Sequence, residues 1–206
     1  MSWLGEQIAL LKEFFRTDFR RTILGCTLGL AVTVVLGAVI ALAAPETVTK
    51  MLSAFQSMVE EAGAIDEAGR LSVFGVLMNN WRAMLVSAAY GLIPFLFLPV
   101  LSLLVNGVIL GMLGAVYASG GALMMYAAGI LPHGIFELPA LILSIACGVQ
   151  LCRNMCRLVV SSPRRTPMVE LLGDLLRVMV LLVAPMTAAA AFIECYVTPA
   201  VMGLFQ

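Results

Sequence analysis

The chain's single histidine, His133, stands four residues before a carboxylate, Glu137, in the stretch LPHGIFELPA. If this stretch is helical, that spacing places both side chains on one face, where the carboxylate would fix the tautomer of the imidazole. The pair would suit a proton relay, half of a metal site, or a charged buttress within the fold. Gly134 beside them would permit the close approach of another backbone. Two ligands do not complete a metal site, so we expect neither a metal nor a cofactor and favour the structural role.

Composition places the chain in a membrane. Of its 206 residues 62% are hydrophobic and 12% are charged, and the mean hydropathy is +1.04. A soluble domain of this length cannot bury that much apolar surface. The net charge of zero argues against nucleic-acid binding, which needs clustered surplus cations. The sequence has no glycine-rich phosphate loop, nucleophile elbow or HExxH motif, so we expect no enzyme activity and no catalytic residues.

Other polar side chains within the apolar stretches are further candidates for function, because such groups are expensive inside a membrane. The structural alternative is that they satisfy one another between helices. Facing inward, Glu194 would meet Arg82 or His133. These further candidates are Asn79, Asn80, Arg82, Asn106 and Glu194.

The distribution of charge predicts the topology. Positive charge gathers in Lys12–Arg21 and Arg153–Arg177, whereas residues 46–70 are mainly acidic. Because positively charged flanks stay in the cytoplasm, we expect a cytoplasmic N-terminus, a cytoplasmic basic loop at 161–177 and an extracytoplasmic acidic segment at 46–70. The uncharged run Thr22–Pro45 is long enough for the first membrane helix.

The uncharged run Ala83–Phe136 is too long for one crossing and suits two. A turn at Gly91–Pro94 would give helices at Val73–Leu92 and Phe95–Ala118. A turn near Asn106-Gly107 would instead give helices at Ala83–Leu104 and Val108–Leu131. Glycine at a helix end and proline at a helix start favour the first arrangement. That arrangement places Arg82 inside a membrane helix, where it needs a partner or water.

Two more crossings follow, at about Pro139–Val160 and Val178–Tyr196, which put the C-terminus outside the cell. Residues 122–131 would be too short to cross and would form a re-entrant or interfacial piece. Residues 1–21 are predicted to form an amphipathic helix on the cytoplasmic surface, although a helix packed on a partner fits the pattern as well. Residues 22–206 would be a single polytopic domain. The fold class is therefore all-α integral membrane, with about five transmembrane helices and one irregular or re-entrant segment.

The order of several polar and glycine residues resembles that of a known family. Asn79-Asn80 comes first, followed by Asn106-Gly107 with Gly111, then LPHGIFELPA with Gly148, and finally FIE with TP. Together they are similar to the stage II sporulation protein M family of bacterial membrane proteins, from the first membrane helix to the C-terminus. The positions that carry the resemblance are Asn79, Asn80, Asn106, Gly107, Pro132, His133, Gly134, Glu137, Pro139 and Glu194.

The resemblance implies a non-enzymatic, multi-pass protein of the bacterial cell membrane. The founding member of the family is needed for engulfment in endospore-forming bacteria. Its role there is similar to that of a scaffold that joins sporulation proteins D and P, which degrade peptidoglycan. By resemblance we expect a membrane scaffold whose partners are other membrane proteins or cell-wall hydrolases. The family also occurs in organisms that do not form spores, so its name does not define the mechanism.

Two other functions fit the residues. A channel or secondary transporter would place His133 and Glu137 in the path of a solute or proton, close to predicted helix breaks. An intramembrane enzyme would use the same two residues as base and acid but lacks an identifiable nucleophile. The spacing of Gly25 with Gly29, and of Gly107 with Gly111, lets helices approach closely, either within the fold or between copies in a homodimer.

Overall fold

The computed structural model describes residues 2–44, 46, 48, 50 and 72–205. None of these residues forms a strand, so the predicted all-α fold is confirmed for the part of the chain that is described. The predicted acidic segment at 46–70 lies outside the described residues, apart from 46, 48 and 50. The elements are α1 (Trp3–Arg16), α2 (Phe19–Ala43), α4 (Val73–Ala89), the 3₁₀ turn η1 (Tyr90–Leu92), α5 (Pro99–Ser119), α6 (Leu123–Val159), α7 (Met168–Val178), the π-helical η2 (Met179–Val183), α8 (Ala184–Met202) and the 3₁₀ turn η3 (Gly203–Phe205).

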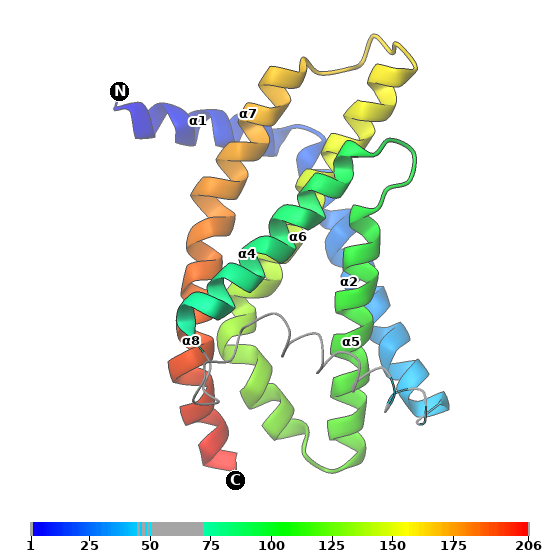
Figure 1. Cartoon of the computed structure of the whole chain (residues 1–206), viewed down its shortest axis with the longest axis vertical. Coiled ribbons are helices and arrows are strands. Elements are labelled where there is room, and N and C mark those ends of the chain that lie inside the picture. Colours follow the sequence, from blue (N-terminus) through cyan, green and yellow to red (C-terminus); the bar gives the residue numbers. More distant parts are fainter. Residues whose placement is uncertain (1, 45, 47, 49, 51–71, 206) are drawn as a thin grey trace.

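Four helical runs within the described residues are long and apolar enough to cross a membrane: Phe19–Ala43, Pro99–Ser119, Leu123–Val159 and Met168–Phe205. The predicted count of about five is close. The remaining long helix, α4, has 17 residues and runs obliquely through the bundle (Figure 1). Its N-cap, Ser72, accepts a hydrogen bond from the backbone N–H of Gly75 at 3.3 Å, which fixes where the helix begins. The C-terminus lies at the end of the bundle opposite α1 (Figure 1).

The chain reverses direction between α4 and α5, at residues 90–98. The two phenylalanines of this connection, Phe95 and Phe97, have positive φ angles of 68° and 46°. Pro99 then opens α5 at a position where its missing N–H costs nothing. Asn106 and Gly107 lie inside α5. The reversal predicted at Gly91–Pro94 is therefore confirmed, although the connection continues to residue 98 and α5 begins at Pro99, four residues after the predicted start at Phe95. The alternative turn near Asn106-Gly107 is wrong.

The re-entrant piece expected at residues 122–131 is corrected by the structure. Leu123–Val159 is one α-helix of 37 residues that includes both Pro132 and Pro139. Each proline removes one intrahelical hydrogen bond and bends the backbone without ending the helix. Figure 1 shows a change of direction in the first half of α6. Residues 140–148 are almost entirely buried, so tertiary packing holds the helix together beyond the prolines.

The two segments richest in positive charge meet at one end of the bundle. The Arg177 Nε donates a hydrogen bond of 2.8 Å to Gln7 of α1, and the Arg153 guanidinium lies 3.9 Å from the carboxylate of Asp18. Leu11 and Phe14 bury the inner face of α1 in the core, whereas three large apolar side chains nearer its start are exposed: Trp3, Leu4 and Ile8. The amphipathic helix ends at Arg16 and the membrane helix begins at Phe19, earlier than the boundary predicted between residues 21 and 22. The basic loop is shorter than 161–177, because α7 begins at Met168.

The helices α2 and α5 pack closely because glycines on α5 leave room for the main chain of α2. A Cβ atom at Gly111 would overlap the main chain of Val34, and one at Gly107 would overlap the side chain of Thr33. The pair Gly107 and Gly111 therefore serves packing within the chain. A Cβ atom at Gly25 would have nothing within 4 Å. The predicted homodimer stays a prediction.

We expect the Gly111→Ala variant to lose about 1–3 kcal/mol of unfolding free energy, because the new methyl group meets main chain that cannot rotate away. Gly25→Ala is the matched control: it adds the same methyl group in open space and should be neutral or slightly stabilising. Denaturant or thermal unfolding of the purified protein in detergent measures both. Equal stability of the two variants would contradict the close contact.

Candidate functional site

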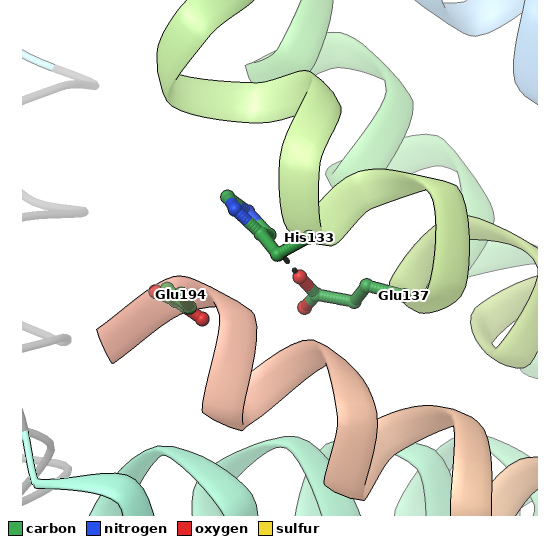
Figure 2. A group of neighbouring side chains, drawn as sticks. All are labelled: His133, Glu137 and Glu194. Atoms are coloured by element: carbon green, nitrogen blue, oxygen red, sulfur yellow. Dashed lines mark ion pairs between the residues drawn. The ribbon is translucent and has the colours of Figure 1, made fainter. Parts of the chain in front are cut away.

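Three ionisable side chains converge between α6 and α8. Figure 2 shows His133 and Glu137 on α6 facing Glu194 on α8. One nitrogen or oxygen atom from each lies within 4.8 Å of the corresponding atoms of the other two. The His133 Nε2 is 3.6 Å from the nearer oxygen of Glu137. The expected shared face of His133 and Glu137 is thus confirmed, and Glu194 meets His133, which was one of its two expected partners.

The second nitrogen of the imidazole also has a partner. The His133 Nδ1 lies 3.2 Å from the Thr198 hydroxyl, which is buried on α8 one turn after Glu194. The imidazole is therefore held on both edges, by a hydroxyl on one side and by a carboxylate on the other. No role was predicted for Thr198 from the sequence. The available signal was the TP dipeptide, four residues after Glu194 and so on the same helix face.

The cluster is well shielded. The His133 side chain is 12% exposed and that of Glu137 is 29% exposed. Gly134 is buried, but a Cβ atom there would meet only the side chains of Ile130 and Leu138, in its own helix. The close approach of another backbone that was expected at Gly134 is therefore not found among the described residues.

A hollow of about 210 Å³ lies beside the cluster, between α5 and α6. His133, Glu137 and Gly134 line one side of it and Asn106 of α5 lines another. The Asn106 amide donates a hydrogen bond of 2.8 Å to the Ser102 carbonyl one turn earlier. The other lining side chains are apolar: Ile109, Leu110, Leu113, Ile130, Leu138 and Leu141. The hollow is thus a small space beside the cluster, and its polar lining side chains are those of the predicted site residues Asn106, His133 and Glu137.

The polar residues of α4 do not join this cluster. The side-chain nitrogen of Asn80 is buried and has no hydrogen-bond partner in the described part of the chain. Arg82 is exposed, and none of the described residues forms an ion pair or hydrogen bond with it. Arg82 is thus not the partner of Glu194. Together with Asn79, these residues occupy a second place in the fold, separate from His133.

The order Thr198, His133, Glu137 matches that of a nucleophile, a base and an acid, but the surroundings do not suit covalent catalysis. Thr198 is 6% exposed and does not line the hollow beside the cluster. Its hydroxyl is therefore shielded from that hollow. What the cluster can do is hold a proton or a cation, because it offers one imidazole nitrogen and two carboxylates.

Comparison with known proteins agrees with the resemblance. The model of the family described as Stage II sporulation protein M matches residues 26–199. An uncharacterized protein of Methanocaldococcus jannaschii is 30% identical over 125 residues, which cover 60% of this chain and 69% of that protein. No solved structure matches the chain.

A double-mutant cycle between His133 and Glu194 tests whether the cluster couples α6 to α8. We expect His133→Ala and Glu194→Gln to change the free energy of unfolding by amounts that are non-additive by about 0.5–2 kcal/mol, because the two side chains lie in one cluster. The measurement is unfolding in detergent with a chelator present. A cycle between His133→Ala and Glu170→Gln, which changes an exposed carboxylate on α7, is the matched control and should be additive. Additivity in both cycles would contradict the coupling.

Proposed function

The chain belongs to the stage II sporulation protein M family, and on that premise we propose that it is a non-enzymatic membrane scaffold. It holds a partner protein of cell-wall remodelling against the exposed face of α4. This partner is a membrane protein or a peptidoglycan hydrolase with a membrane anchor. The partner class comes from the family resemblance. The observation that carries the proposal is the position of Arg82.

Arg82 lies midway along residues 73–92, where α4 and η1 run through the bundle. Its neighbours one turn away, Met78 and Leu85, are apolar and 49% and 45% exposed. A charged side chain that faces lipid at this depth costs from about 2.5 kcal/mol upward. A carboxylate on a partner helix would remove that cost, and it would specify which helix docks there. An arginine on an apolar face, without an acidic partner among the residues that the structure describes, is therefore what a scaffold for a membrane-embedded partner requires.

For the orientation, we propose that the N-terminus is cytoplasmic and the C-terminus extracytoplasmic in the bacterial cell membrane. The contacts of Arg153 with Asp18 and of Arg177 with Gln7 gather the two basic segments at one end of the bundle. This supports the proposal, because positive charge at one end is what the positive-inside rule needs.

Reporter fusions check this orientation. Alkaline phosphatase fused after Phe205 should be active, since this enzyme folds only outside the cytoplasm. The same reporter fused after Arg164, in the basic loop, should be inactive. Equal expression of the two fusions, measured by immunoblot, is the control. The opposite pattern of activity would contradict the proposed orientation.

A second candidate function is a channel or secondary transporter. The hollow beside His133 and Glu137 favours it, because a polar space between two membrane helices suits a solute or proton path. Proton flux into proteoliposomes that contain the purified chain distinguishes the two functions. A scaffold gives no flux above that of empty vesicles, whereas a transporter gives flux that His133→Ala removes.

The scaffold is tested by affinity purification from native membranes in mild detergent, followed by mass spectrometry. We expect a peptidoglycan hydrolase or a membrane protein that binds one to co-purify with the wild type. Arg82→Gln should reduce its recovery about tenfold, the equivalent of 1.4 kcal/mol of binding free energy. The matched control is Arg165→Gln, which removes an exposed arginine in the loop before α7 and should leave recovery unchanged.

Gel filtration must show that the three proteins are equally folded and monodisperse. Equal recovery with wild type and Arg82→Gln would overturn the role of the α4 face. Absence of any cell-wall protein from all three preparations would overturn the scaffold itself.

A further inference from the structure

We propose that His133, Glu137 and Glu194 form a binding site for one divalent transition-metal ion that links α6 to α8. The proposal is independent of the scaffold function. It also departs from the expectation drawn from the sequence, which counted only two ligands. The structure brings in a third, Glu194 of α8, which lies 57 residues after Glu137 in the chain.

The geometry is close to that of a metal centre. With metal–ligand bonds of about 2.0–2.2 Å, neighbouring ligand atoms of a tetrahedral site are roughly 3.3–3.6 Å apart. The His133 and Glu137 atoms are 3.6 Å apart, and the atoms of all three residues lie within 4.8 Å. Small side-chain rotations therefore suffice to close the site. Two ligands four residues apart on one helix are also the arrangement by which helices present side chains to zinc.

Charge balance favours a dication at this place. Glu137 and Glu194 bring two carboxylates together inside the bundle. On α6 and α8, both of which are fully described, His133 is the only basic side chain in contact with either carboxylate. Two like charges at short distance in a medium of low dielectric constant repel strongly. A divalent cation would neutralise both carboxylates and would leave a site with no net charge.

The Thr198 contact prepares the imidazole for this role. A metal-binding histidine commonly donates its other ring N–H to an oxygen, which fixes the tautomer. At His133 that oxygen is the Thr198 hydroxyl, 3.2 Å from Nδ1. Donation from Nδ1 leaves Nε2 without a proton, 3.6 Å from an oxygen of Glu137. A nitrogen lone pair close to carboxylate oxygens is unfavourable by itself. A metal ion bound between the nitrogen and the oxygens makes this arrangement favourable.

The ligand set selects the class of metal. One imidazole and two carboxylates suit Zn²⁺, Mn²⁺ or Fe²⁺, whereas the nitrogen ligand disfavours Mg²⁺ and Ca²⁺. The hollow of about 210 Å³ touches His133 and Glu137, so it offers room for water as a further ligand.

The test uses the full chain, purified in detergent and stripped with a chelator. Titration with Zn²⁺ should load one ion per chain by elemental analysis, and at about 100 times Kd it should raise Tm by roughly 5–10 °C. Mg²⁺ should do neither. Glu137→Gln and Glu194→Gln should each weaken Zn²⁺ binding at least tenfold, while Glu194→His, which keeps a ligand, should retain it. Glu170→Gln, at an exposed position of α7, is the control and should bind as the wild type does.

Variants of Thr198 provide a separate test. Thr198→Val keeps the shape of the side chain but removes the acceptor, so it should weaken Zn²⁺ binding 10–100-fold, and Thr198→Ser should bind normally. Should the glutamine variants fail to fold, Co²⁺ in the wild type and in Glu194→His carries the test through its visible absorption bands. Wild type that takes up no metal, or that shows only adventitious binding unchanged in the glutamine variants, would overturn the proposal.

Discussion

A hydrocarbon environment offers no hydrogen bonds, so every polar group within the bundle must be satisfied by the protein itself. Most polar side chains here obey this constraint by bonding to main chain. The Thr33 hydroxyl donates to the Leu30 carbonyl, and that of Thr187 donates to Val183, both at 2.9 Å within their own helices. The Ser144 hydroxyl donates to the Met84 carbonyl and so joins α6 to α4. Polar residues thereby fix the packing of helices for which the solvent provides no hydrophobic driving force.

At two places in the described part of the chain, polar or charged side chains are not fully satisfied by the protein. These two places face in different directions. The cluster of His133, Glu137 and Glu194 lies between α6 and α8 and has an excess of acceptors. Arg82 lies on the exposed face of α4 and has five donors with no acceptor in the described part of the chain. The first place suits a small cation, and the second suits a partner that carries a carboxylate. Binding inside the fold and binding outside it can therefore be separated by mutation.

Features that depend on residues close together in the chain could be predicted from the sequence. The length of the uncharged runs predicted membrane helices, and the positions of glycine and proline predicted the turn at Gly91–Pro94. The spacing of four residues placed His133 beside Glu137. The continuity of α6 through Pro132 and Pro139 was not predictable, because the packing that holds the helix beyond them is tertiary. The same holds for Thr198, whose partner lies 65 residues away, and for the choice between Arg82 and His133 as the neighbour of Glu194. Such pairings depend on which helix faces which, and periodicity alone does not encode that.

The prolines and the cluster depend on one another. A straight helix of 37 residues would be about 55 Å long, nearly twice the thickness of the hydrocarbon core. Pro132 and Pro139 flank the stretch that holds His133 and Glu137, so the backbone bends where the cluster lies. The bend exposes carbonyls that lack their usual N–H partners, which is a cost inside a membrane. Contacts of this turn with Glu194 and Thr198 offset that cost, because they hold it against α8. A group that tightens the cluster would therefore also fix the angle of α6, and with it the packing of α5 and α8 on either side.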